Sequence, residues 1–172
     1  MTNDPGEAII EALTRPSGRP QTTGQSLGGW QSVRVTGGPF ASARRESIQF
    51  LKERSAGSHR LYAVSYVDEE GHDHLDFVGV VQGPDSSWTR SGSAGGSGKR
   101  PERDRPWVNF GGWWGPNIFA AGGHVIGTDA EPARRVELVF GDGTTLGDSV
   151  DSGLVLFIEE RTLQPPATAR IP

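Results

Sequence analysis

The chain contains no cysteine and no long apolar run among its 172 residues. Without cysteine it can form no disulfide, no thiolate metal site and no thiol nucleophile, and this composition fits a reducing cytoplasm. No segment approaches the roughly 18 apolar residues that a membrane-spanning helix needs. Residues 1–12 lack the basic and apolar regions of a signal peptide. We therefore expect a cytoplasmic protein that has no membrane partner.

An excess of charge of one sign is also absent, because the formal net charge is only −4. Nucleic-acid-binding domains are usually basic, so this charge weighs against a nucleic-acid partner. Glycine and proline, at 25 and 12 residues, are too frequent for a helix bundle and are typical of turn-rich β domains. A hydrophobic content of 34% predicts a core that occupies only part of the chain.

Residues 134–160 carry the clearest secondary-structure signal. Apolar stretches are separated there by Gly141-Asp142-Gly143 and by Asp151-Ser152-Gly153. Asp-Gly turns between apolar stretches are strong hairpin signals, because the turn residues need positive φ. The pattern predicts three consecutive antiparallel strands, over 134–140, 144–150 and 154–160. Since residues 154–158 are all apolar, we expect the last strand to be central and covered on both faces.

Two segments have helical character. Asp4-Pro5-Gly6-Glu7 has the form of a helix start, and Pro16 ends the short helix that follows. Residues 41–55 are ambiguous, since their apolar residues fit both helical and strand spacing. Helix-forming residue types favour a second short helix there, packed on the sheet.

The remaining chain predicts strands separated by flexible segments. β-branched and aromatic residues predict strands over 29–36, 60–67, 75–82 and near Trp88. Residues 91–105 are first rich in glycine and serine and then charged, which predicts a flexible surface loop. We therefore expect a mainly β fold, an antiparallel β-sandwich of seven to nine short strands with one or two short peripheral helices. The expected organisation is a helix and flexible linker over 1–28, the sandwich over 29–163 and an extended tail over 164–172.

Residues 106–119 concentrate tryptophan, phenylalanine and glycine. Tryptophan is enriched at protein–protein hot spots, and its ring stacks on sugars, bases and cations. A Trp-Gly-rich loop at this position could display a binding site to a protein or a small molecule, made of Trp107, Trp113, Trp114 and Asn117. Alternatively, the rings fill the ends of the sandwich, and the glycines let the backbone turn beside them.

The histidines are the other candidates for chemistry. His72 and His74 stand one residue apart, so on a strand they would point to one face and could share a metal ion. No third ligand stands at a telling spacing, although Glu69, Glu70 and Asp76 are near in sequence. A solvated hairpin tip accounts for both histidines, so we predict no metal and no cofactor. His124 lies in an apolar stretch without a nucleophile motif nearby, which favours a core or edge histidine over a catalytic base.

Three segments resemble a family of uncharacterised β-rich proteins from high-GC actinobacteria. They are Pro106-Trp107-Val108-Asn109-Phe110-Gly111-Gly112, Ala121-Gly122-Gly123 and Val136-Glu137-Leu138-Val139-Phe140-Gly141-Asp142-Gly143-Thr144. The last resembles a hairpin that is common in small β-sandwich modules. The resemblance implies a small β-sandwich. It implies no activity, so no catalytic residue is carried over from it.

These observations predict a non-catalytic binding or protein-interaction module that acts through the tryptophan segment. A β-sandwich that binds a small ligand or a carbohydrate with the same rings is the alternative. A small hydrolase is the third hypothesis, using His124, or His72 and His74, with a nearby carboxylate. The sequence leaves open whether the partner is a protein or a small molecule.

Overall fold

The structure, a computed structural model, describes residues 2–15, 21–27, 30–36, 42–95, 107–115, 117–126, 133–163 and 168–172, with the backbone alone for 21–27, 30–36, 107 and 126. Within these ranges the protein is mainly β and contains one α-helix, one 3-10 helix and twelve strands. Every strand pair is antiparallel. None of the described helices has the length and apolar character that crossing a membrane requires.

The strands group into four sheets by their hydrogen bonds. In chain order the elements are α1 (Pro5–Thr14), β1 (Gln21–Leu27), β2 (Trp30–Thr36), η1 (Arg45–Ser47), β3 (Gln49–Ala56), β4 (His59–Val67), β5 (Asp73–Gln82), β6 (Trp88–Gly95), β7 (Trp107–Gly115), β8 (Ile118–Ile126), β9 (Arg135–Val139), β10 (Thr145–Ser149), β11 (Leu154–Glu159) and β12 (Thr168–Arg170). The strand orders are β1-β2, β3-β4-β5-β6, β11-β8-β7 and β10-β9-β12.

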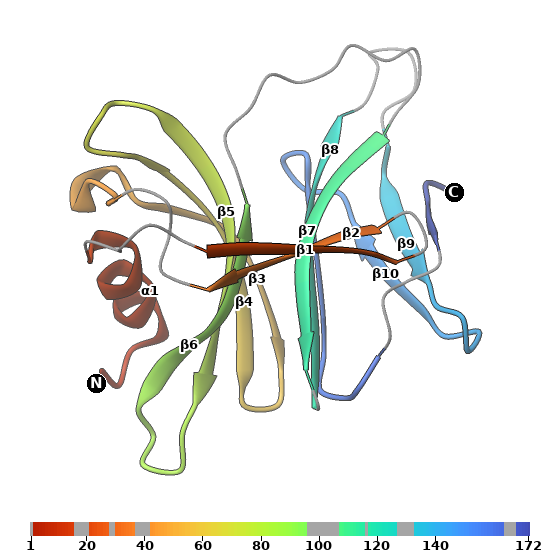
Figure 1. Ribbon diagram of the computed structural model, residues 1–172, viewed down its shortest axis with the longest axis horizontal. Coiled ribbons are helices and arrows are strands. Elements are labelled where there is room, and N and C mark those ends of the chain that lie inside the picture. The colour runs from red at the N-terminus through yellow and green to blue at the C-terminus, as the bar shows by residue number, and fades with distance from the viewer. Residues whose placement is uncertain are drawn as a thin grey trace.

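The helix and three of these sheets stack as layers (Figure 1). Helix α1 places Ile9 and Leu13 against one face of the β3-β4-β5-β6 sheet. The other face of that sheet packs on β11-β8-β7, with Phe77 in contact with the cluster that contains Leu156. The opposite face of β11-β8-β7 packs on β10-β9-β12. The fold is therefore an antiparallel β-sandwich with an added third sheet, and its middle sheet is buried on both faces.

Glycines let aromatic rings fill the space between the β3-β4-β5-β6 sheet and the β11-β8-β7 sheet. The Trp113 indole lies over Gly92, where an added Cβ would be 2.5 Å from ring atom Cε2. The same indole covers Gly79, and the Phe77 ring covers Gly122 in the same way. A side chain at any of these glycines would displace a ring, so the glycine content of the chain serves sheet packing as well as turns.

A buried ion pair ties three sheets together. Strand β11 is the edge of its sheet, and the Asp148 carboxylate of β10 accepts the outward Leu156 N–H at 2.8 Å. The Lys52 ammonium of β3 lies 2.7 Å from Asp148 Oδ2 and donates to the Leu154 carbonyl at 3.0 Å. Arg54 contacts the other oxygen of Asp148 at 2.6 Å. Burial alone would raise the pKa of Asp148, but these hydrogen bonds outweigh burial and hold its pKa below the usual range.

Most predicted elements form where the sequence indicated. Asp4 caps α1 by accepting the Glu7 N–H at 3.0 Å. The strands expected at 29–36, 60–67, 75–82 and near Trp88 correspond to β2, β4, β5 and β6. The predicted turns need positive φ at Gly143 and Gly153, and their φ values are 86° and 75°. Residues 154–157 are buried on both faces, as their composition predicted.

The three-strand meander at the C-terminal end was predicted only in part. Strands β9 and β10 pair as expected, but β11 pairs with β8 in another sheet. The turn at residues 151–153 therefore carries the chain from one layer to the next. Because β8 is its hydrogen-bonded neighbour on one side alone, β11 is an edge strand covered on both faces and does not lie in the centre of its sheet.

Other expectations are corrected by the strands. The helix favoured for residues 41–55 was wrong, since only the 3-10 turn η1 forms there before β3 begins at Gln49. Residues 21–27 of the expected linker form β1, and residues 88–95 form β6, which takes in the start of the expected loop at 91–105. Within the Trp-Gly segment, residues 107–115 form strand β7 and residues 118–119 begin β8, where a loop was expected. Residues 168–170 of the expected tail pair with β9. Residues 96–106 lie outside the described part of the chain.

Candidate functional site

The structure separates the four residues of the predicted tryptophan site. Trp107 begins β7, and its side chain lies outside the described atoms. Trp113 and Trp114 are neighbours on β7, so their side chains point to opposite faces of the strand. Trp114 is 37% exposed, and Asn117 is exposed in the turn between β7 and β8.

Trp113 belongs to the packing between the sheets. It contacts the apolar cluster shared by β4, β5, β8 and β11, and its ring covers Gly79 and Gly92. Its indole N–H is buried and has no hydrogen-bond partner among the described residues. The interpretation that these rings fill the sandwich therefore applies to Trp113. Trp114 remains exposed and accessible to a partner.

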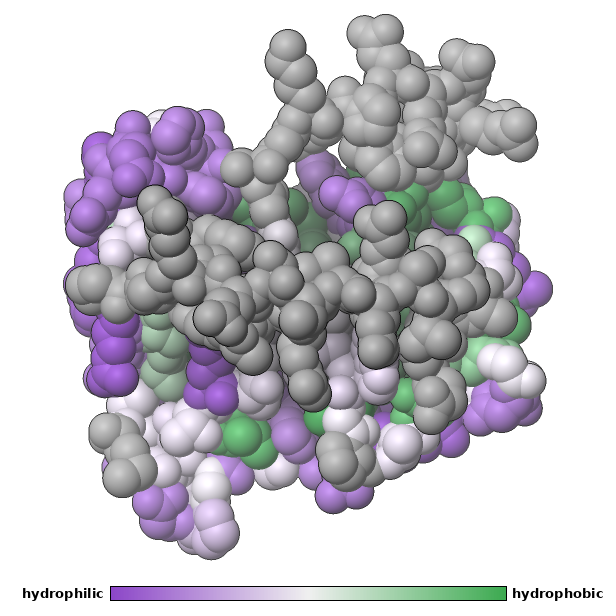
Figure 2. Space-filling view, in the orientation of Figure 1, coloured by the Kyte–Doolittle hydropathy of each residue, from purple (hydrophilic) through white to green (hydrophobic). Residues whose placement is uncertain are grey.

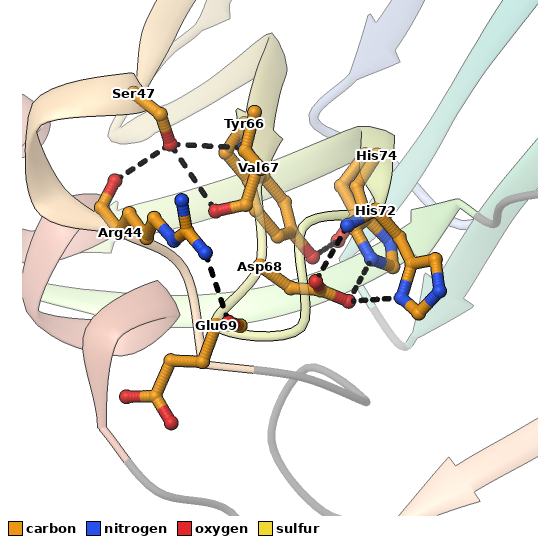
Figure 3. A network of polar contacts seen from close by, with 9 residues as sticks. Arg44, Ser47, Tyr66, Val67, Asp68, Glu69, His72 and His74 are labelled. Carbon is orange, nitrogen blue, oxygen red and sulfur yellow. Dashed lines mark hydrogen bonds and ion pairs between the residues drawn. The ribbon is translucent and has the colours of Figure 1, made fainter.

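A second candidate site lies at the turn that joins β4 to β5 (Figure 3). Strand β4 ends at Val67, and Asp68 begins a tight turn closed by a hydrogen bond from the Gly71 N–H to the Asp68 carbonyl at 3.1 Å. Gly71 has a φ of 92°, a conformation that suits glycine. This turn brings Asp68 and His72 face to face, and His74 follows on β5.

A strap formed by residues 42–47 fixes this turn from the other side. The Arg44 N–H donates to the Val67 carbonyl at 2.9 Å, and the Arg44 guanidinium donates to the Glu69 carbonyl at 2.9 Å. The Ser47 hydroxyl oxygen accepts the Val67 N–H at 2.9 Å. These bonds hold the backbone on both sides of Asp68 in one place, so the Asp68 carboxylate is preorganised.

Both histidines contact the Asp68 carboxylate. Oxygen Oδ2 lies 2.8 Å from His74 Nε2 and 3.2 Å from His72 Nδ1, and Oδ1 accepts the His72 backbone N–H at 2.8 Å. The Asp68 side chain is 3% exposed and that of His74 is 11% exposed, whereas the His72 side chain is 68% exposed. Burial opposes ionisation of Asp68, but the hydrogen bonds from His72 and His74 outweigh it and lower the Asp68 pKa.

The buried side of the site is held by Tyr66. Its ring stacks on the His74 ring with centroids 4.9 Å apart and planes 7° apart. Its hydroxyl donates to Asp76 Oδ2 at 2.9 Å. Burial raises the pKa of Tyr66, and the neighbouring Asp76 carboxylate raises it further. Tyr66 therefore stays protonated and keeps the His74 ring in one orientation.

The sequence prediction for these histidines holds for one of them. His72 is exposed, as expected of a solvated hairpin tip, but His74 is largely buried and stacked. The contact that sequence reasoning missed is Asp68, the first residue of the acidic turn. The pairing of β4 with β5 is the pattern that could have revealed this contact, because it places Tyr66 opposite His74 and leaves Asp68 directly after the end of β4.

His124 lies on β8 opposite Leu154 and is half-buried. It belongs to a different layer from the Asp68 turn, so these histidines form no single centre. The Asp68 turn offers a buried, ionised carboxylate flanked by two imidazoles, which is a group able to orient a proton or to hold a cation. No protein-family model, curated protein or solved structure matches this chain, so the chemistry of these residues is the basis for assigning a function.

Proposed function

We propose that this protein is a non-catalytic binding or protein-interaction module and that it binds its partner at the turn end of the β7–β8 hairpin. The observation that carries the proposal is the exposure of Trp114, which is 37% exposed and is followed three residues later by the exposed Asn117. Partly exposed tryptophan is the residue type most enriched among interface hot spots. Trp113, on the opposite face of the same strand, anchors this hairpin to the sandwich and so presents Trp114 on a rigid support.

The position of β7 in its sheet supports the same surface. β7 is the last strand in the order β11-β8-β7, so within the described strands it has a hydrogen-bonded neighbour on one side only. An edge strand offers backbone N–H and C=O groups that an extended partner segment can pair with. Trp114 then supplies a side-chain contact at the end of such an interface.

A small-ligand or carbohydrate-binding role is the second form of this proposal. The exposed Trp114 and the exposed Asn117, three residues apart in sequence, offer an indole face for stacking and an amide for hydrogen bonding, the two contacts that a sugar ring needs. The hydrolase hypothesis stays a prediction: Asp68 supplies the carboxylate that it requires beside His72 and His74, but the contacts described for these histidines include no hydroxyl nucleophile. A cytoplasmic location is part of the same proposal, and cell fractionation tests it.

Site-specific photo-crosslinking tests this function. A photoreactive phenylalanine analogue replaces Trp114 in one protein and Leu51 in a control protein. Leu51 is a suitable control because it is also an exposed apolar side chain, 42% accessible, on the distant strand β3. We expect position 114 to capture one defined chain in host cells and position 51 to capture only background.

The captured partner is then purified and titrated against the wild-type protein, Trp114→Ala and Leu51→Ala. Loss of a hot-spot tryptophan weakens binding by about 30-fold or more, corresponding to about 2 kcal/mol, whereas the control keeps its affinity. A glycan and metabolite panel tests the small-ligand form with the same variants. Equal capture at both positions, together with no ligand affected by Trp114→Ala, would contradict the proposal.

A further inference from the structure

The turn between β4 and β5 brings three potential metal ligands together. A carboxylate oxygen of Asp68, a carboxylate oxygen of Glu70 and a ring nitrogen of His72 all lie within 4.8 Å of one another. A tetrahedral zinc ion bound at about 2.0–2.2 Å holds its ligand atoms roughly 3.3 Å apart. The Asp68–His72 separation is already 3.2 Å. Because Glu70 and His72 are exposed, their side chains are free to close the remaining distance.

The charge at this turn favours a cation. The described ion pairs of the buried Asp68 carboxylate are with His72 and His74 only, and a neutral imidazole gives a hydrogen bond without neutralising the charge. Exposed carboxylates at Glu69, Glu70 and Asp73 add further negative charge, which exceeds the positive charge of the Arg44 guanidinium on the Glu69 carbonyl. Hydrophilic side chains gather at this end of the molecule (Figure 2). A divalent ion at Asp68 would supply the positive charge that a buried carboxylate needs.

The surroundings of Asp68 resemble the outer layer of a metal site. A ligating carboxylate in such sites is itself held by hydrogen bonds, which fix its orientation. Here His74 Nε2 lies 2.8 Å from Asp68 Oδ2, and the stacked Tyr66 ring fixes His74 in turn. One ligand is therefore buried and held in place, while the other two are exposed and accessible to arriving ions.

We propose that Asp68, Glu70 and His72 form a binding site for a divalent transition-metal ion of the zinc class, with His74 orienting the Asp68 carboxylate. Imidazole together with carboxylate is a donor set for such ions, whereas Ca²⁺ and Mg²⁺ require oxygen ligands. Three protein ligands leave a fourth position for water. The proposal is independent of the Trp114 surface, because it rests on a different sheet and on different residues.

Calorimetric titration of the metal-free protein with ZnCl₂ tests the site. We expect one ion per chain, with affinity at least tenfold weaker in His72→Ala and in Glu70→Gln. Glu69→Gln and Asp73→Asn are the matched controls, since both remove one exposed negative charge at the same turn without removing a proposed ligand. We expect both controls to stay within about twofold of the wild type, and we expect CaCl₂ to give no saturable heat.

Cobalt provides a readout of geometry that a nonspecific charge effect would not move. Co²⁺ bound to the wild-type protein should give visible absorption bands of a four-coordinate site, and His72→Ala should lose them. Because His72 and Glu70 are exposed, their variants should keep the wild-type Tm without metal. Absence of saturable Zn²⁺ binding would overturn the proposal, and so would equal weakening of binding in the ligand variants and the controls.

Discussion

Replacing Lys52 with methionine should destabilise the fold far more than replacing an exposed cation. The Lys52 side chain is 4% exposed, and its ammonium forms an ion pair with Asp148 at 2.7 Å. The ammonium also donates hydrogen bonds to the Ser149 carbonyl at 2.7 Å and to the Leu154 carbonyl at 3.0 Å. Lys52→Met leaves the Asp148 carboxylate buried with Arg54 as its remaining cation. Removing one partner of a buried pair costs about 3–5 kcal/mol, and the remaining Arg54 contact favours the lower end of this range.

The assay is urea unfolding followed by tryptophan fluorescence. A loss of about 3 kcal/mol would be a large part of a stability of about 5–15 kcal/mol and would lower the Tm by roughly 6–12 °C in a chain of this size. Arg45→Met is the control, because Arg45 pairs with Glu7 at 2.8 Å but is 58% exposed. We expect the control to lose less than about 1 kcal/mol. A Lys52→Met variant as stable as the control would refute the structural role of the pair.

Two further results follow from the packing. Because the folded-state pKa of Asp148 is lowered, its contribution to stability is complete above about pH 4, the pKa of an unfolded aspartate, and is lost as the pH falls through the lower folded-state pKa. Urea unfolding of the wild type and of Asp148→Asn across pH 2–7 checks this. The free energies of unfolding of the two proteins should converge only in acid. Trp113→Ala should cost about 3–5 kcal/mol by leaving a cavity, and Gly79→Ala about 1–3 kcal/mol by displacing the same indole, whereas Trp114→Ala should cost less than either in thermal unfolding.

The sequence predicted the strands well because their signals are local. Asp142-Gly143 and Ser152-Gly153 specify turns by backbone geometry alone, and the strands that flank them follow. It could not predict how the strands combine. Strand β11 leaves its sequence neighbour β10 for β8, and the contacts that stabilise this exchange come from Lys52, about a hundred residues earlier in the chain. Such long-range contacts leave no local pattern.

The same limit of local sequence patterns applies to the tryptophan site and to the Asp68 turn. Strand periodicity places Trp113 and Trp114 on opposite faces, but the buried face is decided by Gly79 and Gly92 on other strands. The histidine pair was visible in the sequence as a possible metal site. Of that pair the proposed site uses only His72 as a ligand, and Asp68 became apparent as a candidate ligand only once the turn geometry placed its carboxylate within hydrogen-bond distance of both imidazoles.

The most direct test of the central claim, that the module binds through Trp114 while Trp113 holds the sheets together, is an NMR spectrum of the tryptophan indole N–H groups. The chain has five tryptophans, so five indole signals are expected, and Trp114→Phe and Trp113→Phe assign two of them. In the free protein the Trp113 signal should exchange slowly with solvent, because its N–H is buried, and the Trp114 signal should exchange quickly. When the crosslinked partner or ligand is added, the account predicts that the Trp114 signal shifts and the Trp113 signal stays in place. A bound partner that leaves the Trp114 signal unchanged would contradict it.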